Sequence, residues 1–95
     1  MRIELRAQEL HLQGKINPEN AEQIYQQGLA IIAQQSLPVI VNLSELEQGS
    51  TLALAILIRW LRQTPNAEGL IFKSVPVKML NIIQACHLEK DLPIQ

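Results

Sequence analysis

Residues 39–43 read Val-Ile-Val-Asn-Leu and lie between two segments with helical periodicity. A continuous apolar run of this kind is typical of a strand that is covered on both sides or flanked by other strands, so we expect it to be central in a sheet. Strands that are joined through a helix run in parallel, because the helix carries the chain back to the end of the sheet where the strand began. The run therefore predicts an α/β fold.

Two shorter segments near the N-terminus predict strands with one face in water. Residues 2–6 and 9–13 each alternate Ile or Leu with charged or polar side chains. Ala7-Gln8 between them suits a tight antiparallel hairpin, although the Asn-Gly pair typical of such a turn is missing.

Three helices are predicted from capping signals and apolar spacing. We expect the first from Asn17-Pro18 to about Gln35, the second from Ser50 or Thr51 to about Gln63, and the third after Ser74-Val75-Pro76. The apolar stripe expected on the third helix consists of Val77, Leu80, Ile83 and Cys86.

With a last strand at residues 70–72, the order of elements is ββαβαβα. This order predicts a mixed sheet of about four strands with three main helices packed on one face. The other face, near Arg2, Glu4, His11 and Gln13, is expected to stay in water.

Composition limits the classes of function. The chain has 95 residues, with 8 Lys+Arg against 9 Asp+Glu, so we expect a single domain over residues 1–95 and no nucleic-acid partner. The longest apolar run, residues 52–58, is much shorter than the roughly 20 residues that cross a bilayer, and the N-terminus lacks the apolar core of a signal peptide. A lone cysteine fits a reducing compartment, so we expect a cytoplasmic protein with no direct membrane insertion.

Candidate catalytic and metal-ligating residues are few. Neither His11 nor His87 has a second ligand at a suitable spacing, which disfavours a metal site. Cys86 and His87 are adjacent on a helix end and point in different directions, so we expect Cys86 to be a small buried hydrophobe. The four glycines form no phosphate loop, and an enzyme is disfavoured.

The informative segment is the acidic loop at residues 44–49 and the helix that follows it, which begins with Ser50 and Thr51. Hydroxyl groups at this position lie at the positive end of the helix dipole, beside free backbone N–H groups, where added negative charge is tolerated. We expect Ser50 to be the N-cap, which leaves Thr51 available for another role because a cap needs one of the two.

The same helix is apolar nearly all round through residues 52–58. Covering one side of a sheet takes only one apolar face, so the surplus either fills gaps between helices or contacts a partner. Trp60, the one tryptophan, is either core or an interface anchor.

Over essentially its whole length, the chain resembles the STAS domain family. This family includes the anti-sigma-factor antagonists and the MlaB-type small cytoplasmic subunit of Mla-type phospholipid ABC transporters. Asn42-Leu43 matches the start of the family motif, Ser50 stands where the antagonists have Asp, and Thr51 falls on the hydroxyl that is phosphorylated in them. Leu52-Ala53 replaces the Ser-Gly pair that follows.

These departures disfavour regulation by a kinase, and a Thr at this position is what the transporter subunit shows. The resemblance implies a non-catalytic STAS subunit that binds and regulates the cytoplasmic ATPase of an Mla-type transporter, which maintains outer-membrane phospholipid asymmetry. Such a subunit would be held at the inner membrane through its partner and would take no cofactor or small-molecule substrate. The implied partner-binding residues are Ser50, Thr51, Leu52, Leu54 and Ala55.

Two alternatives from other classes remain. The first is an anti-sigma-factor antagonist that is phosphorylated at Thr51 or Ser50 to change its partner. The second, ranked last, is a small enzyme that uses Cys86.

Overall fold

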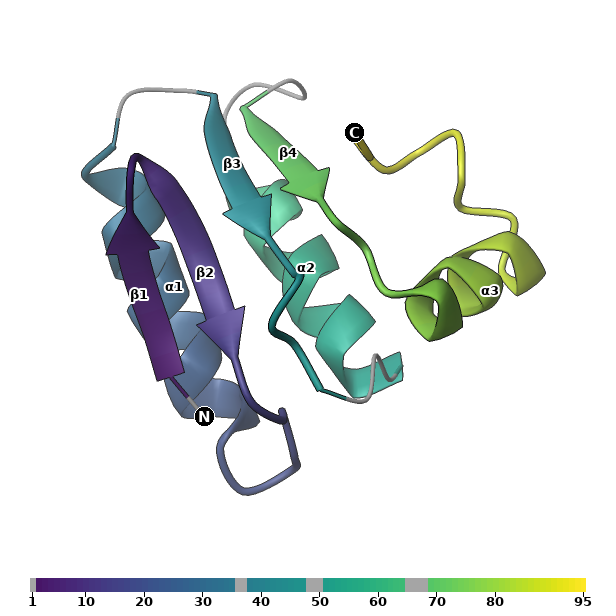
Figure 1. Cartoon of the computed structure of the whole chain (residues 1–95), viewed down its shortest axis with the longest axis horizontal. Helices are drawn as coiled ribbons and strands as arrows, with labels where there is room; N and C mark the ends of the chain where they lie inside the picture. Colours follow the sequence, from purple (N-terminus) through teal and green to yellow (C-terminus); the bar gives the residue numbers. More distant parts are fainter. Residues whose placement is uncertain (1, 36–37, 48–50, 65–68) are drawn as a thin grey trace.

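Four strands form one mixed sheet in the computed structural model, which describes residues 2–35, 38–47, 51–64 and 69–95. The strands are β1 (Arg2–Arg6), β2 (Glu9–Gln13), β3 (Val39–Asn42) and β4 (Leu70–Lys73), and they lie in this order across the sheet (Figure 1). β1 pairs antiparallel with β2, whereas β2–β3 and β3–β4 are parallel. The predicted mixed sheet, with the run at residues 39–43 as an inner strand, is confirmed.

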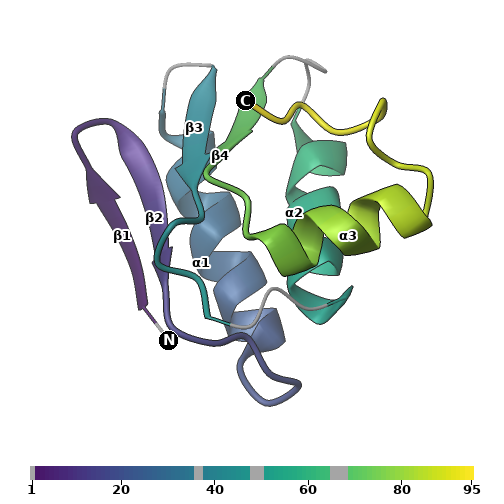
Figure 2. The same ribbon diagram turned by 45° about the vertical axis from the view of Figure 1, so that its right-hand side comes forward.

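Three helices accompany the sheet: α1 (Ala21–Ala33), α2 (Thr51–Gln63) and α3 (Val77–Ala85). α1 and α2 cover one face, whose side chains are at most 2% exposed at Leu10, Leu12, Val39, Val41, Leu70 and Phe72. α3 lies beyond the β4 edge and contacts α2 (Figure 2). After α3 the chain returns to the β4 edge, where Ile94 forms an isolated parallel bridge with Phe72. No helix in the described ranges is long and apolar enough to span a membrane.

The β4 edge is covered by the C-terminal segment of the chain. The Phe72 N–H donates to the Pro93 carbonyl at 2.8 Å, and the Gln95 N–H donates to the Phe72 carbonyl at 2.8 Å. Leu92, just before these residues, is 8% exposed and belongs to the core. Pairing an edge strand in this way satisfies backbone groups that would otherwise be open to another chain.

α1 begins three residues later than the predicted start, because residues 18–20 form a turn. Asn17 still caps this turn as expected: its Oδ1 accepts the N–H groups of Glu19 and Asn20, both at 2.9 Å. The Asn17 N–H donates in return to Asn20 Oδ1 at 2.9 Å. The two asparagines therefore form a reciprocal arrangement like a capping box.

The apolar stripe predicted on α3 is wrong in detail. Met79 and Ile83 are the buried residues, whereas Val77 is 73% exposed. Leu80–Ile83 and Met79–Ile83 are both allowed helical spacings, of three and four residues, and which pair faces the core depends on how the helix sits against α2 rather than on spacing alone.

Trp60 forms the main contact between α1 and α2. Its side chain is fully buried, and its Nε1–H donates to the Tyr25 carbonyl on α1 at 2.9 Å. Where the two helices cross, α1 has Gly28, and a Cβ at that position would overlap with the Trp60 ring. Trp60 is therefore a core residue, which decides between the two interpretations of this residue.

Candidate functional site

The predicted docking residues lie along the first two turns of α2. Thr51 is the first residue of the helix and is exposed, as is Ala55 one turn later. Leu52 is half-buried, whereas Leu54 is 3% exposed and belongs to the core. Ser50 lies outside the described residues. A partner that approaches this helix therefore meets Thr51, Ala55 and part of Leu52.

The surplus of apolar residues on α2 is explained by its place in the molecule. α2 packs on the sheet, touches α1 on one side and α3 on the other, and so buries more than one face. Its buried residues are Ala53, Leu54, Ile56, Leu57 and Trp60. The exposed stripe that remains on its first two turns is Thr51 and Ala55, spaced four residues apart.

The loop between β3 and α2 is tied to the ends of two neighbouring strands. The Leu43 N–H donates to the Lys73 carbonyl at 2.9 Å, and the Glu47 N–H donates to the Gly14 carbonyl at 2.7 Å. The Gly14 N–H donates to the Glu45 carbonyl at 3.2 Å, and Leu46 is buried at 7% exposure. These bonds attach the loop that precedes Thr51 to the sheet.

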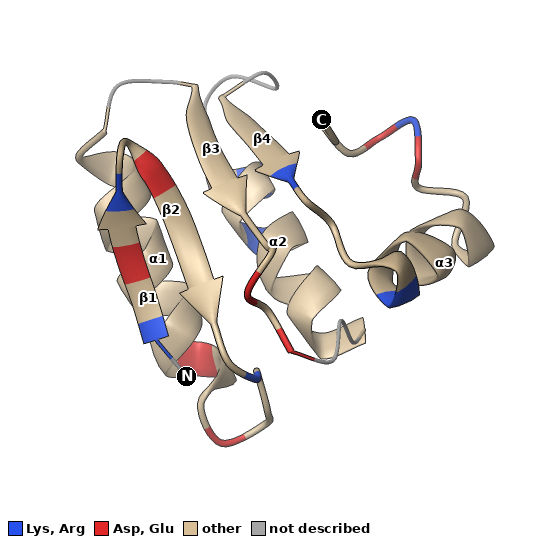
Figure 3. Cartoon of the chain, viewed as in Figure 1, with Lys and Arg blue, Asp and Glu red and all other residues tan. Residues whose placement is uncertain are grey.

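Charged residues of both signs alternate along β1, while the start of β2 and this loop carry acidic residues and the end of β4 a basic one (Figure 3). Glu45 Oε2 accepts hydrogen bonds from Gln13 Nε2 at 2.8 Å and from Arg6 Nη2 at 2.6 Å. These two donors, Gln13 first and Arg6 second, lower the pKa of Glu45 below its ordinary value of 4.5. The loop is therefore also held to β1 and β2 by side chains.

A second polar cluster crosses the sheet on the face away from α1 and α2. Glu9 accepts from Asn42 Nδ2 at 3.0 Å and from Lys73 Nζ at 3.1 Å, and these bonds lower the pKa of Glu9 below its ordinary 4.5. His11 Nε2 lies 3.9 Å from Glu9 Oε1. This cluster is not among the site residues predicted from the sequence. Its signals are the outward alternation of Glu9 on its strand and Asn42, the single polar residue in the apolar run at residues 39–43.

The other candidate residues lie apart from these clusters. Cys86 is exposed at the end of α3, so the expectation of a buried thiol is wrong. A helix end that projects past the sheet leaves this side chain nothing to pack against. His87 follows with a φ of 56°. Within the described residues, no group of three His, Cys, Asp or Glu side chains stands close enough to hold a metal ion.

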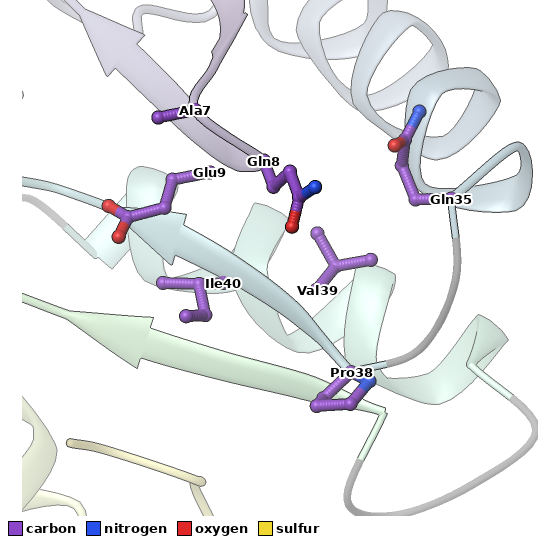
Figure 4. A pocket seen from close by; sticks show the side chains of 7 residues that line it. All are labelled: Ala7, Gln8, Glu9, Gln35, Pro38, Val39 and Ile40. Atoms are coloured by element: carbon purple, nitrogen blue, oxygen red, sulfur yellow. The ribbon is translucent and has the colours of Figure 1, made fainter.

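A cavity of about 430 Å³ lies at the opposite end of the sheet from Thr51 (Figure 4). It is lined by the β1–β2 turn and the start of β2, by the segment that follows α1, and by the start of β3 with the residue before it: Ala7, Gln8, Glu9, Gln35, Pro38, Val39 and Ile40. β3 runs from this cavity towards the loop that leads to Thr51, so the two features are separated by the length of the strand.

Comparisons with known proteins agree with this architecture. The family model described as "Mlab, STAS domain" matches residues 1–94. A chain of the Acinetobacter MlaFEDB complex in the ATP-bound Vtrans2 conformation is 60% identical, with 100% of both chains covered and a TM-score of 0.93. In the Vtrans1 conformation the identity is 62%, the coverage 95% of this chain and 96% of that chain, and the TM-score 0.88. No curated protein sequence matches this chain.

An anti-sigma factor antagonist from Mycobacterium paratuberculosis is a more distant relative. Its sequence is 21% identical, the match covers 98% of this chain and 81% of that chain, and the TM-score is 0.76. At this identity the similarity shows a shared fold. The resemblance inferred from the loop and helix at residues 42–53 is thus confirmed, and the chain belongs to the STAS domain family, in its Mlab-type branch.

Proposed function

We propose that this chain is the STAS subunit of an Mla-type phospholipid ABC transporter, in which it binds the cytoplasmic ATPase subunit and regulates it. The observation that carries this proposal is the full-length match, at 60% identity, to a chain of the Acinetobacter MlaFEDB complex in an ATP-bound conformation. The subunit acts without chemistry of its own. It is held on the cytoplasmic side of the inner membrane through its partner, and the transporter maintains the lipid asymmetry of the outer membrane.

The exposed stripe of α2 suits a docking role. Thr51 and Ala55 are small, so a partner can approach the helix backbone closely, and Leu52 offers apolar area at the rim of the core. Because Leu54 is buried, it supports the surface from below rather than contacting the partner.

Replacing Thr51 by Glu tests this surface. A carboxylate in the first turn of α2 interacts favourably with the helix dipole, by about 0.3–1 kcal/mol, so the isolated chain stays folded. The same charge in a docked interface loses water without gaining a partner, and binding is expected to fall by at least about a hundredfold. Thr51→Ala, which removes only the hydroxyl and a methyl group, is expected to weaken binding less and to leave the melting temperature nearly unchanged.

The measurement is a melting curve for each variant beside a titration with the purified ATPase subunit of the same transporter. Gln63→Glu is the matched control, because it adds the same charge at the exposed far end of α2 and is expected to leave binding unchanged. Binding of Thr51→Glu as tight as that of the parent chain would place Thr51 outside the interface. Unfolding of Thr51→Glu would mean that the residue serves the fold.

The alternative, an anti-sigma-factor antagonist, predicts a different partner. The chain is expected to form a stable complex with the transporter ATPase and none with a histidine-kinase-like anti-sigma factor, since the Asp and Gly that flank the hydroxyl in the antagonists are missing here. Two pull-downs with the opposite results would favour the antagonist.

A further inference from the structure

Glu9 joins three neighbouring strands on the face of the sheet that α1 and α2 leave open. It lies at the start of β2, receives Asn42 Nδ2 of β3 at 3.0 Å on one carboxylate oxygen, and receives Lys73 Nζ of β4 at 3.1 Å on the other. Asn42 is 9% exposed, so its amide needs protein partners for both of its polar atoms.

The second polar atom of Asn42 reaches the loop that leads to α2. Asn42 Oδ1 accepts the Ser44 N–H at 2.9 Å, which fixes the first turn of the loop. The Lys73 carbonyl accepts the Leu43 N–H at 2.9 Å. Asn42 and Lys73 therefore hold both Glu9 and the start of the loop. Asn42 does so through its side chain, whereas Lys73 contacts Glu9 with its side chain and the loop with its backbone carbonyl.

The orientation of the Asn42 amide is determined by these two bonds. Its NH₂ group must point to the Glu9 carboxylate and its oxygen to the Ser44 N–H. The Asn42 amide has an N–H to donate to Glu9 and an oxygen to accept from Ser44, whereas the ionised carboxylate of Glu9 can only accept. The charge on Glu9 thus selects the amide orientation in which Asn42 Oδ1 accepts the Ser44 N–H of the loop.

We propose that Glu9, Asn42 and Lys73 are positioning residues for the docking surface at Thr51: they hold the loop from which α2 begins, and so set the affinity for the ATPase subunit without touching it. This inference rests on the proposed function. It differs from a general stabilising role in one respect, because the effect on binding passes through the Ser44 hydrogen bond.

Exchanging the carboxylate of Glu9 with the amide of Asn42 tests the proposal. Asn42→Asp places a second carboxylate beside Glu9 and removes the donor, and Glu9→Gln removes the charge that Lys73 pairs with. Each is expected to weaken binding of the purified ATPase subunit by about tenfold and to speed hydrogen exchange of the Ser44 amide. In the double variant Glu9→Gln/Asn42→Asp, the introduced amide donates to the introduced carboxylate, which still accepts from Ser44. Binding and exchange are both expected to return to within about threefold of the parent.

All variants are compared at a temperature where melting curves show them folded. Glu22→Gln on α1 is the matched control, because it also converts an ion-paired carboxylate to an amide, yet on an element away from the loop, and it is expected to leave binding and Ser44 exchange unchanged.

Any of three results would overturn the positioning role alone. The first two are single variants that bind like the parent and a double variant that regains its melting temperature without regaining binding. A change in binding with no change in Ser44 exchange would overturn it as well. Failure of the parent chain itself to bind the ATPase subunit would instead overturn the proposed function, and this inference with it.

Discussion

The last turns of α2 pack tightly against α1, whereas its first two turns leave one side, at Thr51 and Ala55, exposed to solvent. Trp60 is fully buried and bonds the α1 backbone at Tyr25, while Arg59 stacks over the Tyr25 ring with its Cζ 3.7 Å from the ring centroid. Thr51 and Ala55 are exposed, and the loop before them is held by hydrogen bonds to strand ends.

The difference between the two ends shows how one helix serves two purposes. Buried aromatic area and a close helix crossing supply stability, and their loss is felt by the whole domain. Small exposed residues contribute little to folding, so they are free to be selected for binding. Substitutions at the two ends are therefore expected to separate stability from docking.

The largest expected effect is at the end of α2 that packs against α1. Trp60→Ala removes the largest buried side chain and leaves a cavity between α1 and α2, and we expect the free energy of unfolding to fall by about 3–5 kcal/mol. Urea denaturation measures this loss. Binding of the ATPase subunit by the fraction of chain that remains folded is expected to stay close to that of the parent. If the folded fraction of Trp60→Ala bound the ATPase subunit more weakly than the parent, stability and docking would not be separated between the two ends of α2.

A smaller effect is expected at Gly28, where a Cβ has no room beside the indole. Gly28→Ala is expected to destabilise the chain by about 1–3 kcal/mol, because the rigid crossing has to open. Elsewhere in a helix, replacing glycine by alanine stabilises the chain by about 1 kcal/mol. A destabilising effect at Gly28 would therefore come from the neighbouring Trp60 ring.

Trp60→Phe serves as the background that reveals this dependence. The smaller ring makes room at the crossing, and Gly28→Ala in that background is expected to be neutral or stabilising. The coupling between the two sites comes from the four melting or denaturation curves of a double-mutant cycle. If the stability changes of Gly28→Ala and Trp60→Phe were additive, the indole of Trp60 would not be the reason that residue 28 is a glycine.

The elements themselves could be predicted because their signals are local. The helical spacing after residue 50 predicts a helix that begins at Ser50 or Thr51, and α2 begins at Thr51. The run at residues 39–43 predicts an inner strand, and β3 is one. The contact of Gly28 with Trp60 could not be predicted in this way, since it depends on where two helices cross. The face that α3 buries likewise depends on packing, which spacing alone does not contain.

Side-chain clusters across strands were beyond prediction for a related reason. Glu9 meets Asn42 and Lys73 only because β2, β3 and β4 pair in one register, and a shift by one residue would send these side chains to the other face. The hairpin is a different case: Ala7 and Gln8 both have positive φ, 50° and 66°, without the Asn-Gly pair that favours this conformation. The pairing of β1 with β2 therefore imposes positive φ on Ala7 and Gln8, although these residue types do not favour it.

The smallest expected effects come from two carboxylates that serve opposite ends of α2. Glu22 on α1 pairs with Arg59 at 3.0 Å, and hydrogen bonds from Arg59 and then Gln26 lower its pKa below the ordinary 4.5. Glu45, held by Gln13 and Arg6, serves the loop before Thr51, and its pKa is lowered as well. Both carboxylates are exposed enough for solvent to screen them, so each contributes little to stability.

The sign of their pH dependence follows from linkage. A carboxylate whose pKa is lower in the folded than in the unfolded chain stabilises the fold above its unfolded pKa, near 4.5, and loses this contribution as the pH falls through the folded pKa. Melting temperatures measured from neutral pH into the acid range below 4.5 are therefore expected to drop less steeply in Glu22→Gln and in Glu45→Gln than in the parent. At neutral pH, Glu45→Gln is also expected to weaken docking slightly, because the loop before Thr51 loses a charged anchor, whereas Glu22→Gln is expected to leave docking unchanged. Equal effects of the two variants on docking would mean that the two ends of α2 are not independent, since Glu45 holds the loop before Thr51 and Glu22 pairs with Arg59 on the later turns of α2.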